Sequence, residues 1–293
     1  MKILQRKDID TDRWDQRISE NETENIFCYS WYLDAVADEW CAVTTDNYKT
    51  IVPVPFTIKL GIRQMYNAPF CREYDIFGSE FNWTDVATIL HKEFKGIHFR
   101  NASADLFDGG TERKHQWLTL GEDVQSNYRT NARRLVKKGN GIFNFGIDTE
   151  VTQLVELFRR TAARKIDSIN DEDLERLIML MDNAMAHNQG ELILAEEEGK
   201  MVAGGFFLKD KSSITYLKGA AEDDAKKNGV MFSLLDFAFQ RYSQDFETFD
   251  FGGSDVEAVA TFYKKFGAKD RVYYDYKIER LPLWFKTLKK LRS

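Results

Sequence analysis

The sequence predicts an α/β (α+β) protein with two domains, each a mixed and mostly antiparallel sheet flanked by helices. Three observations support this fold class. The chain has 293 residues, which at roughly 150 residues per domain favours two domains over one. Helical and strand periodicities alternate along the second half of the chain. The first half contains a fainter series of the same elements, so the element order suggests an internal duplication.

The second half has the clearest pattern. Asp148-Thr149-Glu150 offers an N-cap for one helix, and Asn170 opens another with acidic residues near its positive end. Glu198-Gly199 marks a tight turn between two strands. The predicted elements are helices that start at 151 and 171, strands 191–197, 201–208 and 214–220, a helix 230–242, a strand 248–251, a helix 256–266 and a strand 271–277.

The first half predicts a helix over 29–40, strands 41–45 and 50–54, a helix 83–94, and strands 97–99 and 115–120. Three of the four prolines lie between Pro53 and Pro69, so we expect that stretch to be mostly irregular loop. The expected domains are 1–125, a basic interdomain helix and linker 126–147, a second domain 148–280, and a basic tail 281–293.

Composition excludes several functional classes. Net charge is −6, with 41 basic and 47 acidic residues, which argues against wrapping of nucleic acid; we expect no DNA partner. Three cysteines and four histidines show no metal-ligand spacing, so no metal site is expected. The N-terminus is charged from Lys2 onward and no apolar run is long enough to span a bilayer. These observations predict a soluble, cytoplasmic protein.

The strongest local motif is Phe249-Asp-Phe-Gly-Gly-Ser254, in which a short strand ends at paired glycines before a helix that Gly267 terminates. Paired glycines permit positive φ and a close approach of another backbone or a ligand. The Asp-Phe-Gly triplet also occurs in protein kinases, but neither a glycine-rich loop nor an HRD motif accompanies it here. The motif therefore does not indicate a kinase.

The element order of residues 148 to 277, with a helix that ends "FYKKFGA", resembles an acyltransferase fold of the GNAT type. The whole chain from about residue 27 to 277 resembles the FemAB-like family of tandem GNAT proteins. Three stretches carry the resemblance: "VPVPFTIKLGIRQMYNAPF", "HQWLTLGEDVQSNYRTNARRLVKKG" and "FDFGGSDVEAVATFYKKFGA". The family comprises peptidoglycan bridge-forming aminoacyltransferases, which use aminoacyl-tRNA, and relatives thought to use acyl-CoA.

The resemblance implies a set of catalytic residues. Tyr263 matches the tyrosine that often protonates the leaving thiolate, although it would serve equally as the buried face of an amphipathic helix. Asp250 and Asp255 are the nearest carboxylates and could accept the amine proton or cap a helix. Gly219 lies where the family's bulged strand would offer a backbone N–H to the acyl oxygen.

The resemblance also implies a phosphate-binding loop at a helix N-terminus. The matching stretch is Lys226-Lys227-Asn228-Gly229-Val230-Met231. Lys226 and Gly229 fit the pattern loosely, and Lys226 and Lys227 offer positive charge, but Met231 stands where a small residue should let a phosphate approach the backbone. An ordinary solvated turn before a helix explains the same residues.

A basic segment precedes the second domain. Its cations share one side of a predicted helix, and no acidic residue lies among them: Arg129, Arg133, Arg134, Lys137 and Lys138. Arginine suits bidentate recognition of phosphate. The segment therefore predicts either a site for an anionic ligand, such as the tRNA acceptor end, a nucleotide-linked precursor or the phosphates of CoA, or a solvated surface helix.

Together these features predict an N-acyltransferase with no tightly bound cofactor. An activated donor, acyl-CoA in preference to aminoacyl-tRNA, would pass its acyl or aminoacyl group to an amine acceptor, such as a cell-wall precursor. Two alternatives remain: an aminoacyl-tRNA-dependent peptidoglycan bridge transferase, and a non-catalytic GNAT-fold binding module. Met231 favours the binding module, whereas Tyr263 and the intact glycine pair favour the enzyme.

The C-terminal segment 277–293 carries six basic residues and one acidic residue. From Pro282 onward, Trp284, Phe285 and further leucines line one side of a predicted helix, and cations fill the rest. This pattern is typical of a helix at an anionic membrane surface, so residues 281–293 predict peripheral contact with the inner face of the membrane. The alternative is a terminal helix that docks on its own protein.

Overall fold

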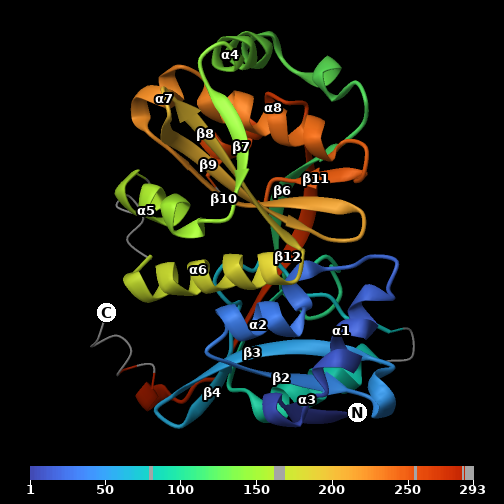
Figure 1. Ribbon diagram of the computed structural model, residues 1–293. Coiled ribbons are helices and arrows are strands. Elements are labelled where there is room, and N and C mark those ends of the chain that lie inside the picture. Colours follow the sequence, from blue (N-terminus) through green and yellow to red (C-terminus); the bar gives the residue numbers. More distant parts are fainter. Residues whose placement is uncertain (79–81, 162–168, 254–255, 286, 288–293) are drawn as a thin grey trace. The chain divides into compact units, whose positions relative to one another are not determined.

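The computed structural model describes residues 1–78, 82–161, 169–253, 256–285 and 287 (Figure 1). The chain forms two compact units, which we call unit 1 (Met1–Arg113 and Val272–Ser293) and unit 2 (Lys114–Arg271). It passes from one unit to the other inside two strands, β6 (Thr111–Thr119) and β12 (Lys269–Glu279).

These boundaries differ from the expected ones at 125, 147 and 280. The basic segment is helix α4 (Thr130–Asn140), and it belongs to unit 2 because it packs on α8 (Val230–Tyr242). The last strand divides between the units, because from Tyr274 onward β12 pairs with β5 (Gly96–Asn101) of unit 1. Residues 281–293 also belong to unit 1.

Unit 2 contains a mixed sheet whose described strands run in the order β6-β11-β10-β9-β8-β7. Neighbouring strands are antiparallel except for β10 and β11, which are parallel. The predicted elements of this half are confirmed to within a few residues, whereas β7 and α7 were not predicted. Besides α4, α8 and the two shared strands, the elements are β7 (Asn144–Asp148), α5 (Val151–Thr161), α6 (Asp171–Ala186), β8 (Gly190–Glu197), β9 (Lys200–Lys209), β10 (Ser213–Ala221), α7 (Asp223–Lys227), β11 (Thr248–Asp250) and α9 (Glu257–Lys264).

Helices cover both faces of this sheet. Adjacent glycines on β9 show the two faces, because successive strand residues point in opposite directions. A Cβ on Gly204 would touch Leu154 of α5, and a Cβ on Gly205 would touch Leu234 of α8. Figure 1 shows the same arrangement, with α5 and α6 on one side of the sheet and α8 on the other. The core of the unit lies between the sheet and α8, where Phe207, Phe239 and Phe249 pack together.

Unit 1 has a second mixed sheet, with the order β1-β2-β3-β4-β5-β12 among its described strands. It too contains one parallel pair, β4 and β5. One parallel pair in each antiparallel sheet supports the duplication suggested by the element order. The remaining elements are β1 (Lys2–Gln5), α1 (Thr11–Ser19), α2 (Ser30–Val36), β2 (Glu39–Thr44), β3 (Ile51–Lys59), β4 (Ile62–Met65) and α3 (Trp83–Glu93).

The proline-rich stretch is the main correction to the sequence analysis. We expected irregular loop, but Pro53 and Pro55 lie inside β3 and pair with Ala42 and Trp40 of β2. Alternate residues of a strand direct their backbone N–H and C=O groups to the same edge, so Ile51, Pro53 and Pro55 share one edge of β3. At this edge the N–H of Ile51 donates to Phe77, and the carbonyl of Pro55 accepts from the N–H of Tyr66. The edge where the two prolines lack an N–H donor therefore faces away from β2, so the β2–β3 pairing loses no hydrogen bond. On that edge, β4 pairs with β3 only from Phe56 onward.

The helix predicted over 29–40 is also shorter than expected. It ends at Val36, and Trp40 lies in β2 instead, with its ring 5.2 Å from that of Trp14 on α1. The cause is tertiary: Trp40 gains a buried neighbour on the sheet that a continued helix would not supply.

The start of the C-terminal tail is anchored in unit 1. Leu281 and Phe285 are buried, whereas Leu283 and Trp284 are exposed. The described part of the apolar stripe is thus divided between the protein interior and its surface. Leu288, Leu291 and most of the cations of this segment lie outside the described residues. Within the described part of the chain, no helix is long and apolar enough to cross a membrane. Membrane contact by the tail stays a prediction.

A buried acidic group in unit 1 makes stability depend on pH. Burial, and then the charge of Glu73, raise the pKa of Asp75 to about 6. A carboxyl whose pKa is higher in the folded state stabilises the fold below its unfolded value, and this contribution is lost as pH rises through 6. We expect Asp75→Asn to raise the free energy of unfolding at pH 7.5 by about 1–2 kcal/mol and to leave it unchanged at pH 4.

Thermal or urea unfolding at the two pH values measures this effect. The carboxamide keeps an acceptor for Asn25, whose Nδ2 lies 3.0 Å from Asp75 Oδ2. Asp105→Asn, at an exposed position in the same unit, is the control and should change stability equally at both pH values. A stabilisation by Asp75→Asn that is the same at pH 4 and 7.5 would contradict the titration.

Candidate active site

The site is built around the parallel strands β10 and β11. They pair over only three residues each, Ser213–Thr215 with Thr248–Asp250. Directly after, β10 has a bulge between Tyr216 and Lys218, and the chain after β11 turns at Gly252 and Gly253, both with positive φ. A bulge bends a strand and re-aims its groups, so the regular pairing of the two strands ends here, and we call this point the opening between β10 and β11. A Cβ on Gly252 would lie 2.6 Å from the carbonyl oxygen of Tyr216, which only glycine tolerates.

Two buried tyrosines lie on the α8 side of this opening. Tyr263, on α9, is 8% exposed and stacks on Phe251 with 4.4 Å between ring centroids. Burial, and then the charge of Asp250, raise the pKa of Tyr263 well above that of a free phenol. Tyr216 is its neighbour, since burial and then Tyr263 raise the pKa of Tyr216. Tyr263 therefore belongs to the aromatic core and also lies beside a carboxylate at the opening.

The carboxylate of Asp250 is held by a buried histidine. His115 Nδ1, on β6, lies 3.1 Å from Asp250 Oδ2, and His115 is 1% exposed. The backbone N–H of Gly252 donates to Asp250 Oδ1 at 2.8 Å, which fixes the turn at the glycine pair. The sequence analysis missed His115 because 135 residues separate it from Asp250; only the antiparallel pairing of β6 and β11 brings them together.

Lys218 was also missed as a site residue. Directly beyond the bulge, its side chain points to the other face of the sheet, where Nζ lies 4.2 Å from the ring centroid of Phe158 on α5. Burial lowers the pKa of Lys218 to about 8. A lysine with that pKa is partly neutral near pH 7 and can accept a proton. The opening thus has a phenol on one face and a basic amine on the other.

Gly219 follows the bulge, which falls between Tyr216 and Lys218, and its role in binding an acyl oxygen stays a prediction. A Cβ there would lie 1.6 Å from the hydroxyl oxygen of Tyr216, so the absence of a side chain makes room for that phenol. Asp255, the other carboxylate named from the sequence, lies outside the described residues. Among the residues that the structure describes, no group of three or more potential ligands could hold a metal ion.

The predicted phosphate-binding loop has a different environment. Gly229 caps α8 with φ of 89°, and a Cβ there would lie 2.7 Å from the carbonyl oxygen of Leu135 on α4. Helix packing therefore accounts for this glycine. Lys226 and Lys227, on α7, contact Asp223 and Asp224 one turn earlier. A phosphate cannot approach Gly229 from the side that α4 covers.

The basic face of α4 lies next to this loop, because Lys138 Nζ is 2.9 Å from Asn228 Oδ1. Arg133, Arg134, Lys137 and Lys138 are all exposed, and within the described ranges none of them forms an ion pair. The structure thus brings the α4 cations and the two α7 lysines into one region. Charge on exposed side chains, rather than a backbone cradle, is what this region offers an anion.

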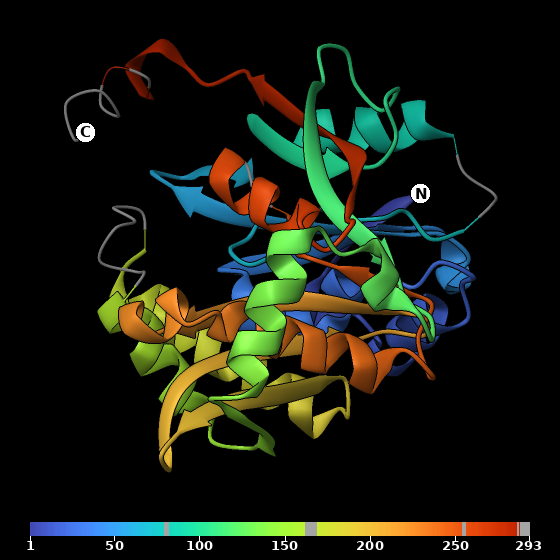
Figure 2. The same ribbon diagram turned by 90° about the horizontal axis from the view of Figure 1, so that it is seen from above.

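Contact between α4 and α8 depends on another glycine. Figure 2 shows α4 (green) crossing α8 (orange), and at the crossing a Cβ on Gly139 would lie 2.1 Å from Ser233 Oγ. We expect Gly139→Ala to lower the free energy of unfolding by about 1–3 kcal/mol, because the methyl group overpacks the contact. Gly141→Ala is the matched control, since its Cβ would meet only ordinary contacts of 3.5 Å or more. Urea denaturation of both variants checks the difference; an equal effect of the two substitutions would contradict the packing.

Comparisons with known proteins agree with this geometry. Residues 123–265 match the family described as "Acetyltransferase (GNAT) domain". A search of curated protein sequences finds no significant match.

Solved structures resemble the fold of nearly the whole chain. The crystal structure of FemX matches with a TM-score of 0.70 and 12% identity, over 97% of this chain and 99% of that one. A tandem GNAT protein from the clavulanic acid biosynthesis pathway matches with a TM-score of 0.53 and 8% identity, over 96% and 98%. L-PGS from Bacillus licheniformis matches with a TM-score of 0.53 and 12% identity, over 86% and 88%. At these identities the likeness concerns the fold.

Proposed function

We propose that this chain, which belongs to the FemAB-like GNAT family of acyltransferases, transfers an acyl or aminoacyl group to an amine at the opening between β10 and β11. One observation carries the proposal: the pairing of two parallel strands ends at a bulge, with Tyr263 on one face of the sheet and Lys218 on the other. An acyl group in the opening would be accessible to a donor from one face and an acceptor from the other.

In the proposed reaction the acceptor nitrogen attacks the acyl carbon, and the bond from that carbon to the donor's sulfur or oxygen breaks. Neutral Lys218 takes the proton that the amine loses. Backbone N–H groups at the bulge, near Gly219, stabilise the oxyanion of the intermediate. An ordinary phenol has a higher pKa than a thiol, and the pKa of Tyr263 is raised further. Tyr263 therefore assists the leaving group as a hydrogen-bond donor rather than by full proton transfer.

The proposed donor is an acyl thioester with a phosphate-bearing carrier, such as acyl-CoA. Cations of α4 and α7, including Arg133 and Lys226, would hold its phosphates at the protein surface. The contact between Gly229 and α4 favours a second candidate, an aminoacyl ester donor such as aminoacyl-tRNA, which needs no cradle at Gly229. An amine of a cell-wall precursor is the proposed acceptor, and the two-unit architecture shared with FemX supports it.

A donor screen separates these candidates. We expect an acyl-CoA to raise the melting temperature by mass action, and mass spectrometry to show a new amide when cell-wall precursors with free amines are added. Stabilisation by an aminoacyl-tRNA mimic alone would move the assignment to the second donor. Stabilisation by a donor without any acylated product would identify a binding module instead of an enzyme.

The basic face of α4 makes a further prediction. Donor affinity of the Arg133→Ala, Arg134→Ala variant should fall about tenfold or more at low salt, and the salt dependence of binding should become shallower. Isothermal titration of the donor at two salt concentrations measures both quantities. Lys200→Ala, an exposed lysine on β9, is the control. Unchanged affinity of the double variant at low salt would show that the α4 cations are only a solvated surface.

A further inference from the structure

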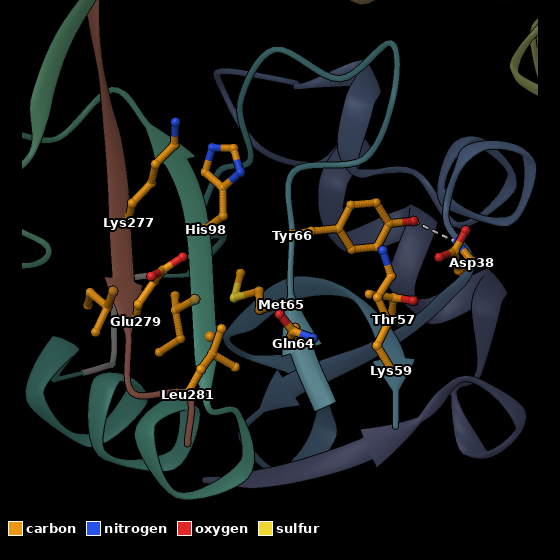
Figure 3. A pocket seen from close by; sticks show the side chains of 13 residues that line it. Asp38, Thr57, Lys59, Gln64, Met65, Tyr66, His98, Lys277, Glu279 and Leu281 are labelled. Atoms are coloured by element: carbon orange, nitrogen blue, oxygen red, sulfur yellow. Dashed lines mark hydrogen bonds between the residues drawn. The ribbon is translucent and has the colours of Figure 1, made fainter. Parts of the chain in front are cut away.

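A pocket of about 430 Å³ lies wholly within unit 1, over strands β3, β4, β5 and β12 (Figure 3). This volume falls in the range of about 300–1,000 Å³ that is common for small-molecule sites. Apolar residues line part of it, among them Met65, Ile97 and Leu281. Polar and charged side chains line the rest: Asp38, Thr57, Lys59, Gln64, Tyr66, His98, Lys277 and Glu279.

Strand register directs the polar residues to one face. Thr57 pairs with Gln64, Gln64 with Gly96, and His98 with Lys277, and residues opposite each other on neighbouring strands point to the same side. Phe56 is adjacent to Thr57 and points the other way, where it packs on Phe94 after α3. The pocket is therefore on the face opposite α3, and Gly96, which has no side chain, leaves space at its floor.

Positive charge gathers at one end of this pocket around a single buried carboxylate, Asp275. His98 Nε2 lies 2.6 Å from Asp275 Oδ1, and Arg100 Nε lies 3.3 Å from the same oxygen. Arg113 and Lys277 each lie 3.5 Å from Oδ2. Three permanent cations thus surround one negative charge. Burial would raise the pKa of Asp275, but Arg100 and His98 outweigh it and keep the carboxylate ionised.

This excess reaches the pocket through His98 and Lys277, whose side chains lie next to each other in Figure 3. The other charged lining residues are Lys59, Asp38 and Glu279. Lys59, Lys277, Arg100 and Arg113 together exceed Asp38, Glu279 and Asp275 by one positive charge. Burial lowers the pKa of His98, so its ring adds no charge until it takes up a proton. Lys277 is exposed, whereas the side chains of Arg100 and Arg113 are only 23% and 31% exposed. Partly buried cations in excess favour a counter-ion of opposite sign.

Gln64 adds a directional group. Its Nε2 atom is buried, and among the described residues it has no hydrogen-bond acceptor. Leaving a buried donor unpaired costs about 1–3 kcal/mol. Gln64 lines the pocket beside Gly96, so rotation of its amide toward an acceptor atom of a molecule in the pocket would remove this cost.

We infer that this pocket binds a small molecule through an oxyanion group, a carboxylate or a phosphate, which Lys277 holds together with His98 once His98 Nδ1 carries a proton, while Gln64 donates to a second polar atom. The inference is independent of acyl transfer, because every residue in it belongs to unit 1. It adds a ligand site to the unit that the GNAT family match leaves entirely uncovered.

Two probes separate the sources of the anion: inorganic pyrophosphate and succinate. Because the α4 cations could also bind an anion, the titrations use the full chain with Arg133→Ala and Arg134→Ala. We expect calorimetry at low salt to show binding of at least one probe, and His98→Gln with Lys277→Gln to weaken it about tenfold or more. Lys92→Gln, an exposed lysine on α3, is the matched control and should leave affinity unchanged.

Asp275 keeps Arg100 and Arg113 in the double variant, so the fold should survive; its melting temperature checks this. Should it unfold, Gly96→Ala serves instead, because its methyl group would make only ordinary contacts with Gln64 at 3.4 Å or more and would occupy the floor. Binding of pyrophosphate alone assigns a phosphate ligand, and binding of succinate alone assigns a carboxylate. Absence of binding by both probes, or affinity that neither folded variant lowers, overturns the inference.

Discussion

Replacement of Tyr263 by phenylalanine is expected to lower kcat by about a hundredfold and to leave thermal stability almost unchanged. The substitution removes one hydroxyl group and keeps the ring that stacks on Phe251. Because the proposed hydrogen bond strengthens as the leaving group gains charge, the loss should affect kcat more than KM. Steady-state kinetics with the donor identified by the screen, together with a melting curve, measure both quantities.

Tyr216→Phe is the matched control, because it removes the neighbouring buried hydroxyl beside Gly219. We expect a much smaller change in kcat for this variant. A loss confined to Tyr216→Phe would transfer the role to Tyr216. Full turnover of a folded Tyr263→Phe variant would leave Tyr263 as a core residue only, as the alternative interpretation of its helix holds.

Replacement of Lys218 by methionine is expected to reduce kcat/KM by about a hundredfold or more at pH 8. Its pKa of about 8 means that the neutral, proton-accepting form increases as pH rises through that value. The wild-type rate should therefore rise with pH and level off above about 8, and this limb should disappear in the variant. A rate profile from pH 6 to 9.5 measures the change, and a donor with a pH-stable ester or thioester bond is required.

The control for Lys218 is Lys200→Met, which replaces an exposed lysine of the same unit. Its profile should match that of the wild type. A Lys218→Met variant that loses rate equally at every pH would indicate that the lysine supports the fold, through its contact with Phe158, and does not accept the proton.

The origin of the candidate site shows how far local sequence patterns reach. The glycine pair could be found from the sequence, because a strand that ends in two glycines has a distinctive local signature. The resemblance to GNAT proteins pointed to Tyr263 and to the strand around Gly219. His115 and Lys218 could not. A single histidine or lysine in a strand has no signature, and its role depends on which strand lies beside it and which face it occupies.

The same limit applies to the pocket in unit 1. His98 and Arg100 of β5 lie 175 or more residues from Asp275 of β12 in the sequence. Each of the three is an ordinary charged or titratable residue in its own segment. The prolines of β3 show the opposite failure, since a strong local signal for loop was overridden by strand pairing. Gly229 is a third example of a local pattern that the tertiary structure explains differently. The motif predicted a phosphate-binding loop, whereas the close contact with α4 accounts for the glycine.

By itself, the sequence determined the fold class, the element order of the second half and the resemblance to the FemAB-like GNAT family. Hydrophobic period, caps and turn residues act over a few neighbouring positions, and such short-range physics can be read along the chain. The tertiary structure alone decided the unit boundaries, the burial that shifts the pKa of Lys218 and Tyr263, and the charge cluster around Asp275. Those properties arise from desolvation and from charges that long-range strand pairing brings within a few ångströms, and neither is encoded in local order.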